Sequence, residues 1–545
     1  MTDLDGQVRA WIGQDPDPVT RDELQRLLDD GSPEARAELA ERFDGTLTFG
    51  TAGLRGPLRG GPQGMNRVVV ARAAAGLAAH LLAEDAAPSL VIGYDARHGS
   101  ERFARDTAEV VAGLGVRAHL LPRPLPTPVL AFAIGHLGTS AGVMVTASHN
   151  PPRDNGYKVY LGDGIQIVPP ADAAIAGRID AVGPVDALVR SEDYVLLDDA
   201  VEQAYVDAVA AVPDDGPREL VVAYTPMHGV GADVVDAVVA RAGFAPLHVV
   251  AEQREPDPDF PTVAFPNPEE PGAMDLALAL AAEVGADVVV ANDPDADRCA
   301  VGVPAGQGWR MLTGDETGVL LADLLLRRGV EGTYACSIVS SSLLGRLAAA
   351  HGQRFEQTLT GFKWIARAEG LAFGYEEALG YAVAPSVARD KDGISAAVRV
   401  LQLAAELRAE GRSLTDRLDD LAREHGLHAT SQLSVRVEDL SLITDAMARL
   451  RADPPVALGG LDVVGVDDLA HGGDGLPPTD GLRIRLAEDA RVVVRPSGTE
   501  PKLKAYLEVV LPVTDDAPDA VDALRISAAG RLDAIRGDLA LLVGG

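Results

Sequence analysis

Three aspartates in the segment ADVVVANDPDADRCAVGV (286–303) are the first candidates for chemistry. Asp293, Asp295 and Asp297 are spaced two apart after an apolar stretch, so on an extended or curling backbone their carboxylates point to one side. Three clustered carboxylates repel one another unless a cation neutralises them, and oxygen ligands of this kind suit Mg²⁺. An EF-hand is excluded because Arg298 stands where that loop needs glycine. The run predicts a metal site, with a solvated acidic turn as the alternative.

The segment VTASHNPPRDNGYKVY (145–160) presents a hydroxyl group at the end of an apolar run. Ser148 falls at the carboxyl end of the expected strand AGVMVTAS, and Pro151 and Pro152 stiffen the loop that follows. Lys158 adds a positive charge ten residues after the serine. The glycines of a serine-hydrolase elbow, G-x-S-x-G, are missing. Ser148 is therefore a candidate nucleophile of another kind, and a capped turn is the alternative.

A third group of charged residues lies in FGYEEALGY (373–381) and ARDKDG (388–393). Glu376 stands between glycines, where a carboxylate can accept hydrogen bonds from ligand hydroxyls. Arg389 and Lys391 are available for a phosphate group. Ordinary surface charge is the alternative interpretation of both segments.

The segment RPSGTEPKLKAY (495–506) is rich in hydrogen-bond donors. It follows the expected strand ARVVV and offers Arg495, Ser497, the amide of Gly498, and Thr499 within five residues. Such a glycine-containing nest of donors suits a phosphate group. A tight Pro-Ser-Gly turn is the alternative.

Lysine is rare in this chain. Only five of the 48 basic residues are lysine, and the rest are arginine. A lysine provides a compact point charge with a titratable proton, which arginine does not. Each lysine lies in a segment rich in Gly, Pro or Ser, so we expect each to lie in a loop at the end of an element, and most to be functional. They are Lys158, Lys363, Lys391, Lys502 and Lys504.

The elements that must position these residues can be read from the patterns around them. Segments 90–121, 220–250 and 333–360 each read as strand, glycine-marked turn, helix, strand, which is the pattern of a βαβ unit with parallel strands. In open α/β sheets, ligands gather at the carboxyl ends of the strands, where we expect the segments above to lie. Residues 1–45 have a helical pattern and predict an N-terminal helical extension.

The C-terminal part alternates like antiparallel strands, with helical runs at 441–453 and 517–541. The predicted fold class is α/β, with three related α/β domains containing mixed, mostly parallel sheets and a C-terminal α+β domain. The predicted domains are 1–206, 207–312, 313–428 and 429–545. They carry in turn the serine loop, the aspartate loop, the glutamate loop and the donor-rich loop.

Composition limits the classes of function. The formal charge of −33 over 545 residues excludes nucleic acid as a general partner, because phosphate backbones need a basic face. The first residues, MTDLDGQVRA, are polar and do not resemble a signal peptide, and no apolar run is long enough to span a membrane. The chain has only two cysteines, Cys299 and Cys336, without the spacing of a metal site, which is typical of a protein in a reducing compartment. We therefore expect a cytoplasmic protein with no membrane partner.

Six motifs in order resemble those of the α-D-phosphohexomutases, the phosphoglucomutase/phosphomannomutase superfamily. They are FGTAGLRG, TASHNP, DPDADR, TGFKWI, GYEEALG and RPSGTEP. The resemblance extends over nearly the whole chain. The forms of GYEEALG and TGFKWI are most similar to the branch of bacterial phosphoglucomutases and phosphopentomutases. The resemblance implies four domains around a central cleft, the first three sharing one fold.

The resemblance also implies roles for individual residues. Ser148 would carry a phosphate, and one Mg²⁺ per chain would be held by that phosphate with Asp293, Asp295 and Asp297. Arg298 follows the aspartates as in the family pattern. The residues implied around the transferring group are Arg55, Lys158 and Lys391, and the candidates for moving the hydroxyl proton are His149, Lys391 and Arg55. Those implied for substrate binding are Lys363, Glu376, Arg495, Ser497, Gly498 and Thr499, with Arg389 available for phosphate.

The implied activity is a Mg²⁺-dependent isomerase that interconverts glucose 1-phosphate and glucose 6-phosphate by phosphotransfer through a sugar bisphosphate. One departure from the family bears on the sugar: Ala378 stands where the family often has serine in Glu-x-Ser, which puts strict glucose specificity in doubt. Mannose or pentose phosphates, or synthesis of a hexose bisphosphate, are the alternatives within the class. A non-catalytic sugar-phosphate-binding module is the alternative from another class. The sequence leaves open whether the protein is a monomer or a dimer.

Overall fold

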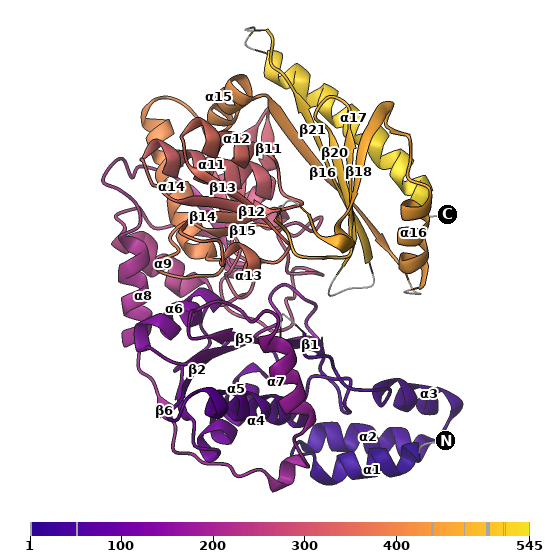
Figure 1. Cartoon of the computed structure of the whole chain (residues 1–545). Coiled ribbons are helices and arrows are strands. Elements are labelled where there is room, and N and C mark those ends of the chain that lie inside the picture. Colours follow the sequence, from indigo (N-terminus) through magenta and orange to yellow (C-terminus); the bar gives the residue numbers. More distant parts are fainter. Residues whose placement is uncertain are drawn as a thin grey trace. The chain divides into compact units, whose positions relative to one another are not determined.

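The computed structural model divides into two compact units, each described by itself below. Unit 1 comprises Met1–Met311 and Gly380–Ala405, and unit 2 comprises Leu312–Leu379 and Glu406–Gly545. Figure 1 labels many of their elements. The described residues are 3–50, 53–437, 441–473, 475–497, 502–515, 517 and 519–543. Within these ranges no helix is both long and apolar enough to cross a membrane.

Unit 1 begins with three short helices, which confirms the predicted helical extension. Proline occupies an early position in the second and third, where its missing N–H costs nothing, and Asp17 and Ser32 cap these two helices. Trp11 and Leu24 are buried in the adjoining core. The helices are α1 (Leu4–Gln14), α2 (Pro18–Asp30) and α3 (Pro33–Arg42).

The first sheet of unit 1 has six strands and is mixed. Its central strands β2 and β4 are largely apolar and buried, and helices α5 and α6 both pack against them. In spatial order the strands are β1 (Leu54–Pro57), β5 (Asp154–Leu161), β4 (Ala141–Val145), β2 (Ser89–Tyr94), β3 (Arg117–Leu120) and β6 (Val195–Leu196). The β1–β5 and β5–β4 pairs are antiparallel and the others are parallel. The helices are α4 (Arg67–Glu84), α5 (Ser100–Gly113), α6 (Thr127–Leu137), α7 (Ala171–Asp180) and α8 (Ala200–Ala210).

The second sheet of unit 1 has five strands, of which β7 pairs in parallel with both β8 and β9. Its order is β11 (Gly308–Met311), β10 (Ala300–Ala305), β9 (Val288–Ala291), β7 (Val222–Thr225) and β8 (His248–Val249). Its helices are α9 (Ala232–Arg241) and α10 (Asp275–Val284). The segment Gly380–Ala405 contributes β15 (Gly380–Ala382) and the start of α14 (Gly393–Ala409) to the same unit.

Unit 2 contains a parallel α/β part and an antiparallel part. In the first, β12 pairs in parallel with β13 and β14, and helix α11 starts with a capping box between Thr313 and Glu316. The strands are β12 (Thr333–Ser337), β13 (Arg354–Thr358) and β14 (Leu371–Glu376). The helices are α11 (Gly314–Arg327), α12 (Leu343–Ala350), α13 (Phe362–Ile365) and α15 (Leu414–His425).

The C-terminal sheet is antiparallel throughout its six strands. Helix α17 packs against β16 and β21, and residues of α16 and α17 close its core. The order is β16 (Leu427–Arg436), β21 (Lys502–Leu511), β20 (Arg491–Pro496), β19 (Leu482–Leu486), β18 (Leu461–Asp468) and β17 (Ala457–Leu458). The helices are α16 (Ser441–Ala452) and α17 (Ala520–Val543).

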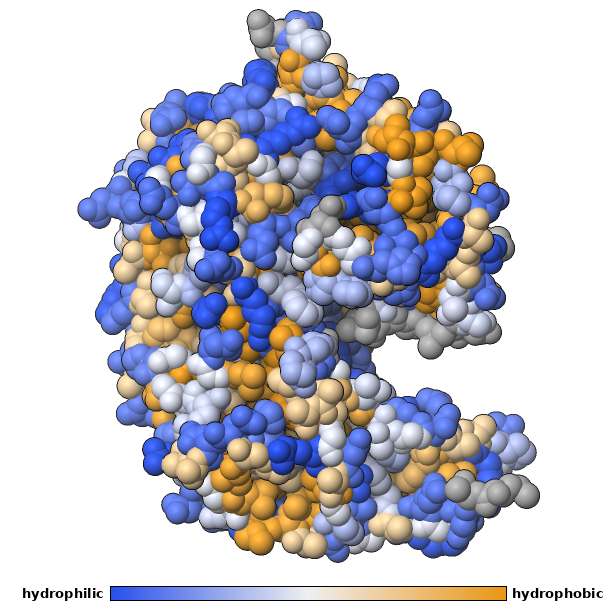
Figure 2. All heavy atoms as spheres, in the orientation of Figure 1, coloured by the Kyte–Doolittle hydropathy of each residue, from blue (hydrophilic) through white to orange (hydrophobic). Residues whose placement is uncertain are grey.

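These sheets confirm the predicted fold class and all three strand–helix–strand units, β2–α5–β3, β7–α9–β8 and β12–α12–β13, each of which has parallel strands. The domain boundaries and the central cleft stay predictions. The face drawn in Figure 2 is largely hydrophilic with apolar patches between, in keeping with the net charge of −33.

The expectation that every lysine lies in a loop is wrong. Lys158 lies within β5, Lys363 lies in α13, and Lys502 and Lys504 lie within β21. The alternating apolar residues around the strand lysines give those segments a β pattern that outweighs the neighbouring glycines and prolines. Lys391 alone of the five lies between elements.

Candidate active site

The serine loop begins directly after the buried strand β4. Ser148 is 2 % exposed, and its backbone has φ of 51°, a left-handed conformation that costs a residue other than glycine on the order of 1 kcal/mol. Its N–H donates to Thr146 Oγ1 at 2.9 Å. The buried guanidinium of Arg97 donates to the carbonyl oxygens of Ser148 and Asn150, both at 2.6 Å, and to that of Pro151 at 2.8 Å. The loop is thus held in a strained shape by hydrogen bonds from a single arginine.

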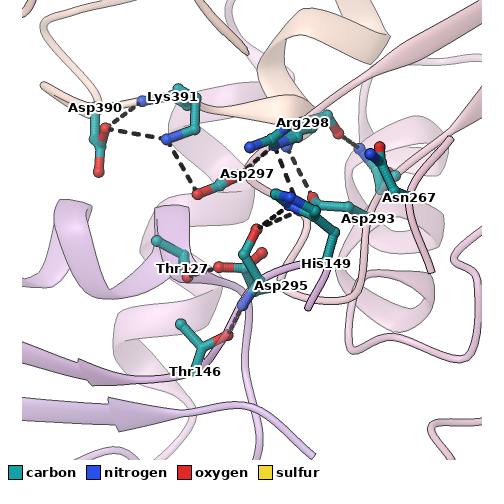
Figure 3. Close-up of polar contacts among 12 residues, drawn as sticks. Thr127, Thr146, His149, Asn267, Asp293, Asp295, Asp297, Arg298, Asp390 and Lys391 are labelled. Carbon is teal, nitrogen blue, oxygen red and sulfur yellow. Dashed lines mark hydrogen bonds and ion pairs between the residues drawn. The ribbon is translucent and has the colours of Figure 1, made fainter. Parts of the chain in front are cut away.

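The three aspartates converge at the end of β9. Ligand oxygens of Asp293, Asp295 and Asp297 all lie within 4.8 Å of one another, and all three side chains are buried. Ala296, with φ of 53°, makes the turn that brings the last carboxylate back. Ser148 Oγ donates to Asp293 Oδ2 at 2.8 Å, so the serine and aspartate loops meet. Figure 3 shows His149 of the first loop beside Asp293 of the second.

Two carboxylate oxygens of the aspartate cluster are available to bind a cation. Among the described residues, no hydrogen-bond donor reaches Oδ1 of Asp295 or Oδ1 of Asp297, although both atoms are buried. Buried carboxylate oxygens without a donor are costly, and a divalent ion with oxygen ligands satisfies them. The predicted convergence of the aspartates is confirmed, and this donor set suits Mg²⁺.

Two lysines partly neutralise the aspartates. Lys158 Nζ lies 2.7 Å from Asp295 Oδ2 and 3.0 Å from Asp297 Oδ2, and Lys391 Nζ lies 3.3 Å from Asp297 Oδ2. Thr127 Oγ1 donates to Asp295 Oδ2 at 2.7 Å. Lys158 reaches the cluster because β5 is antiparallel to β4 and places it opposite Met144, near the serine end of that strand.

The aspartates therefore differ in their protonation behaviour. Burial, with the charges of Asp295 and Asp297, raises the pKa of Asp293 well above its ordinary value. Although burial would also raise it, the pKa of Asp297 is lowered by Lys158, Lys391 and Arg298. Asp293, which faces the serine hydroxyl, is thus the carboxylate with the least compensation for its charge.

Lys391 is fixed by its two acidic neighbours. Asp390 accepts hydrogen bonds from Tyr160 Oη and Gln166 Nε2, both at 2.8 Å, and Asp392 accepts one from Tyr205 Oη at 2.8 Å. Since both tyrosines belong to the first part of unit 1, the 380–405 segment packs with the serine and aspartate loops.

The next turn of that segment also lies close to the aspartate loop. A Cβ on Gly393 would lie 2.1 Å from the carbonyl oxygen of Arg298, so the approach of the two backbones requires glycine there. Lys391 is consequently part of the same rigid neighbourhood as Ser148.

The remaining basic residues surround the serine. Arg55 Nη1 donates to Asn150 Oδ1 at 3.1 Å, and His149 Nδ1 lies 3.1 Å from Ser148 Oγ. Burial, followed by the charges of Arg298 and Arg55, lowers the pKa of His149 well below its ordinary value, so its ring is uncharged at neutral pH. Arg298 Nε lies 3.8 Å from Asp293 Oδ2, whereas Arg389 is exposed.

In unit 2 the two glutamates that end β14 have different surroundings. Glu377 Oε2 accepts from Ser337 Oγ at 3.0 Å and Ser340 Oγ at 3.2 Å, and burial together with Glu376 and Asp315 raises the pKa of Glu377 to about 7. No described residue hydrogen-bonds the half-buried side chain of Glu376. Of this pair, Glu376 is the one left to accept bonds from a ligand.

The donor-rich segment lies near these glutamates. The Arg495 side chain, in β20, lies close to the side chain of Tyr506, whose pKa is raised by burial and then by Glu377. Ser497 donates its backbone N–H to the Lys502 carbonyl oxygen at 2.8 Å. Lys363, in α13, is half-buried. Gly498 and Thr499 lie outside the described residues.

Comparison with known proteins decides the family. The models that match are described as phosphoglucomutase/phosphomannomutase alpha/beta/alpha domain I (residues 46–185), domain II (203–306), domain III (313–425) and C-terminal domain (433–513). The chain belongs to the phosphoglucomutase/phosphomannomutase family. The resemblance seen in six motifs is thereby confirmed, and with it the coarse activity class of an isomerase acting by phosphotransfer.

The names of relatives in the family refer to different sugar substrates. The chain is 50 % identical over 454 residues to a "Probable phosphomannomutase" of Haemophilus influenzae, an alignment covering 82 % of this chain and 93 % of the relative. It is 33 % identical to a "Phosphopentomutase" of Mus musculus, covering 95 % and 92 %. The crystal structure of a "putative phosphomannomutase" from Thermus thermophilus is 27 % identical, with a TM-score of 0.72 over 92 % of this chain and 99 % of that one.

Several residues of this phosphoglucomutase/phosphomannomutase site carry no sequence signal of their own. Arg97 lies 51 residues before Ser148, and Thr127 lies 168 residues before Asp295. Tyr160 and Tyr205 lie among apolar residues and read as core. Their roles depend on contacts between distant segments. For Arg97, the glycine-flanked charged segment GYDARHG at the end of β2 is the signal that could have found it.

Proposed function

We propose that this chain interconverts glucose 1-phosphate and glucose 6-phosphate through a phosphate carried on Ser148 and a hexose bisphosphate intermediate. One observation carries the proposal: Ser148 Oγ lies 2.8 Å from one of three convergent buried aspartates. A module that only binds sugar phosphates has no need of a strained, cation-flanked hydroxyl. The alternatives within the family act on mannose or pentose phosphates, as the names of its relatives suggest.

Charge neutralisation and positioning are the main requirements of phosphoryl transfer. Asp293, Asp295 and Asp297 would hold Mg²⁺, which when bound supplies positive charge to the oxygens of the transferring group. Lys158 and Lys391 add two ammonium groups within 3.3 Å of Asp297. Arg97 holds the serine loop rigid, so the phosphate on Ser148 keeps its orientation in both half-reactions.

The sugar hydroxyl must lose a proton when it accepts the phosphate. The ring of His149 is uncharged and lies next to Ser148, whereas Lys158 has its pKa raised by Asp295 and Asp297 against the opposing effect of burial. We assign His149 to take this proton. Lys391 lies 3.3 Å from Asp297 Oδ2, where its ammonium group would stabilise the transferring group. In the second half-reaction Ser148 takes the other phosphate from the bisphosphate.

The experiment that tests the sugar compares glucose, mannose and ribose 1-phosphates, each primed with a trace of its bisphosphate. We expect the highest kcat/KM for glucose 1-phosphate, with glucose 6-phosphate as product and no free phosphate released. A higher value for mannose or ribose 1-phosphate would reassign the sugar within the family. Release of inorganic phosphate would indicate a phosphatase, and absence of any reaction would favour the binding module.

Glu376→Ala should lower kcat/KM for glucose 1-phosphate by about 10²–10⁴-fold. A carboxylate that accepts bonds from two sugar hydroxyls contributes about 1.5–3 kcal/mol per bond. The half-buried Glu376 has no described hydrogen-bond partner, and Ala378 offers no hydroxyl beside it. Steady-state kinetics with glucose 1-phosphate and its 3- and 4-deoxy analogues measure the loss.

The deoxy substrates show whether Glu376 binds the sugar hydroxyls or has only a structural role. If Glu376 binds those hydroxyls, the analogues lose little more in Glu376→Ala than they have already lost in the wild type. Additive losses would withdraw the assignment. Arg495→Ala is the matched comparison, because a residue that binds only phosphate should weaken glucose, mannose and ribose phosphates alike.

A further inference from the structure

A cavity of about 210 Å³ lies in unit 1 where the N-terminal helices meet the flank of the first sheet. Helices α1, α4 and α7, which supply much of its wall, are labelled in Figure 1. None of its lining residues belongs to the serine, aspartate or lysine groups described above. The lining residues include Trp11, Leu47, Phe49, Val69, Arg72 and Ile179.

Two side chains of this wall have hydrogen-bond donors that no described residue satisfies. The Trp11 side chain is 6 % exposed, and its indole Nε1 is buried without an acceptor among the described residues. No ion pair or hydrogen bond joins Arg72 to a described residue, its Nε is buried, and its guanidinium carbon lies 5.9 Å from the Trp11 ring centroid. A buried donor left unpaired is costly, so an occupant with acceptor atoms would relieve both residues.

The charges around the cavity favour an anion. Arg72 is the cationic residue of the wall, and Asp180 is the acidic one. Asp180 is exposed, so water and salt screen its charge. The Arg72 Nε is shielded from water, where its attraction for a carboxylate is stronger.

The size and the apolar side chains on one part of the wall specify the rest of the occupant. An apolar cavity of about 150 Å³ is large enough to bind benzene, so a cavity of about 210 Å³ holds a six-membered ring with one small substituent. Leu47, Phe49 and Ile179 supply apolar surface for such a ring. We propose that this cavity is a binding site for a small aromatic carboxylate, with its ring on these side chains and its carboxylate accepting from Trp11 Nε1 and Arg72.

The site is connected to the serine loop through the strand β1. Leu54 lines the cavity and pairs with Tyr157 in the sheet. The next residue, Arg55, donates to Asn150 two residues after Ser148. An occupant in contact with Leu54 is therefore one residue away from Arg55, whose side chain contacts the serine loop, and this makes the cavity suited to a regulatory ligand.

Binding is tested with benzoate and benzyl alcohol on the full-length protein by isothermal titration calorimetry. We expect saturable one-to-one binding of benzoate, and about 10- to 100-fold weaker binding of benzyl alcohol, which lacks the charge. Arg72→Met, which keeps an apolar stem but removes the cation, should abolish this preference. Arg9→Met, at an exposed arginine of α1, is the matched control and should leave benzoate binding unchanged.

A second variant tests the site even if the Arg72→Met protein does not fold. Val69→Phe should fill the cavity and remove benzoate binding while leaving the thermal unfolding midpoint near that of the wild type. Equal affinity for benzoate in wild type and Val69→Phe, or the absence of saturable binding in wild type, would overturn the proposal. A crystal grown with benzoate that shows only water in the cavity would do the same. None of these measurements uses catalysis, so their outcome is separate from that of the proposed mutase activity.

Discussion

Ser148→Ala will lose sugar-phosphate isomerisation by about 10⁴-fold or more, the size of effect seen when a covalent nucleophile is removed. Alanine removes the hydroxyl's contacts with Asp293 and His149 but not the support of the loop, because Arg97 and Thr146 hold it through the backbone of residue 148. Alanine in this left-handed conformation pays about the same strain as serine. The fold and the affinity for glucose 6-phosphate should therefore persist.

Intact-mass measurement supplies the readout that a structural defect would not change. Active wild type should carry one phosphate, which Ser148→Ala should lack, and peptide mapping should place it on Ser148. Ser140→Ala is the matched control, because Ser140 stands just before the same strand and only accepts a hydrogen bond from the Ser89 N–H. Full mutase activity in Ser148→Ala, or phosphate on another residue of the active enzyme, would contradict the mechanism.

The parts of the fold that could be predicted are those with local patterns. Each strand–helix–strand segment carries its own periodicity and glycine turns, so the three parallel units are predictable without any long-range contact, and the structure confirms them. The convergence of Asp293, Asp295 and Asp297 was predictable for the same reason, since all three lie within five residues after one strand.

The parts that could not be predicted depend on distant segments meeting. The Tyr205–Asp392 hydrogen bond joins residues 187 positions apart, and nothing in the local sequence of either indicates the other. The lysine expectation was wrong for Lys158 because its neighbours in GYKVYL pack as a strand. Its proximity to the aspartates follows from the antiparallel register with β4, which is a tertiary property.

Removal of divalent cations will abolish turnover, and Mg²⁺ will restore it. The physical reason is that Asp293, Asp295 and Asp297 place three carboxylates within 4.8 Å, and two lysines leave the buried Oδ1 atoms of Asp295 and Asp297 without donors. Calcium should support much less turnover, because it favours longer bonds and more ligands than this site offers. Undiminished turnover in excess chelator would contradict the metal assignment.

The Asp293→Asn variant tests whether the three aspartates bind a metal ion or are only an acidic cluster whose charges repel one another. Burial and the two neighbouring carboxylates raise the pKa of Asp293, so replacing it with a neutral amide should raise the thermal unfolding midpoint in chelator. In Mg²⁺ the order should reverse, because wild type gains about 2.7 kcal/mol when Mg²⁺ is present at 100 times its Kd. The affinity of the variant for Mg²⁺ should fall by at least about 10- to 100-fold, because that is the loss seen when only a residue that hydrogen-bonds a metal ligand is removed. Asp163→Asn, at an exposed aspartate of the same unit, is the control and should show the wild-type shift. If Mg²⁺ raises the midpoint of Asp293→Asn as much as that of wild type, this carboxylate does not bind the ion.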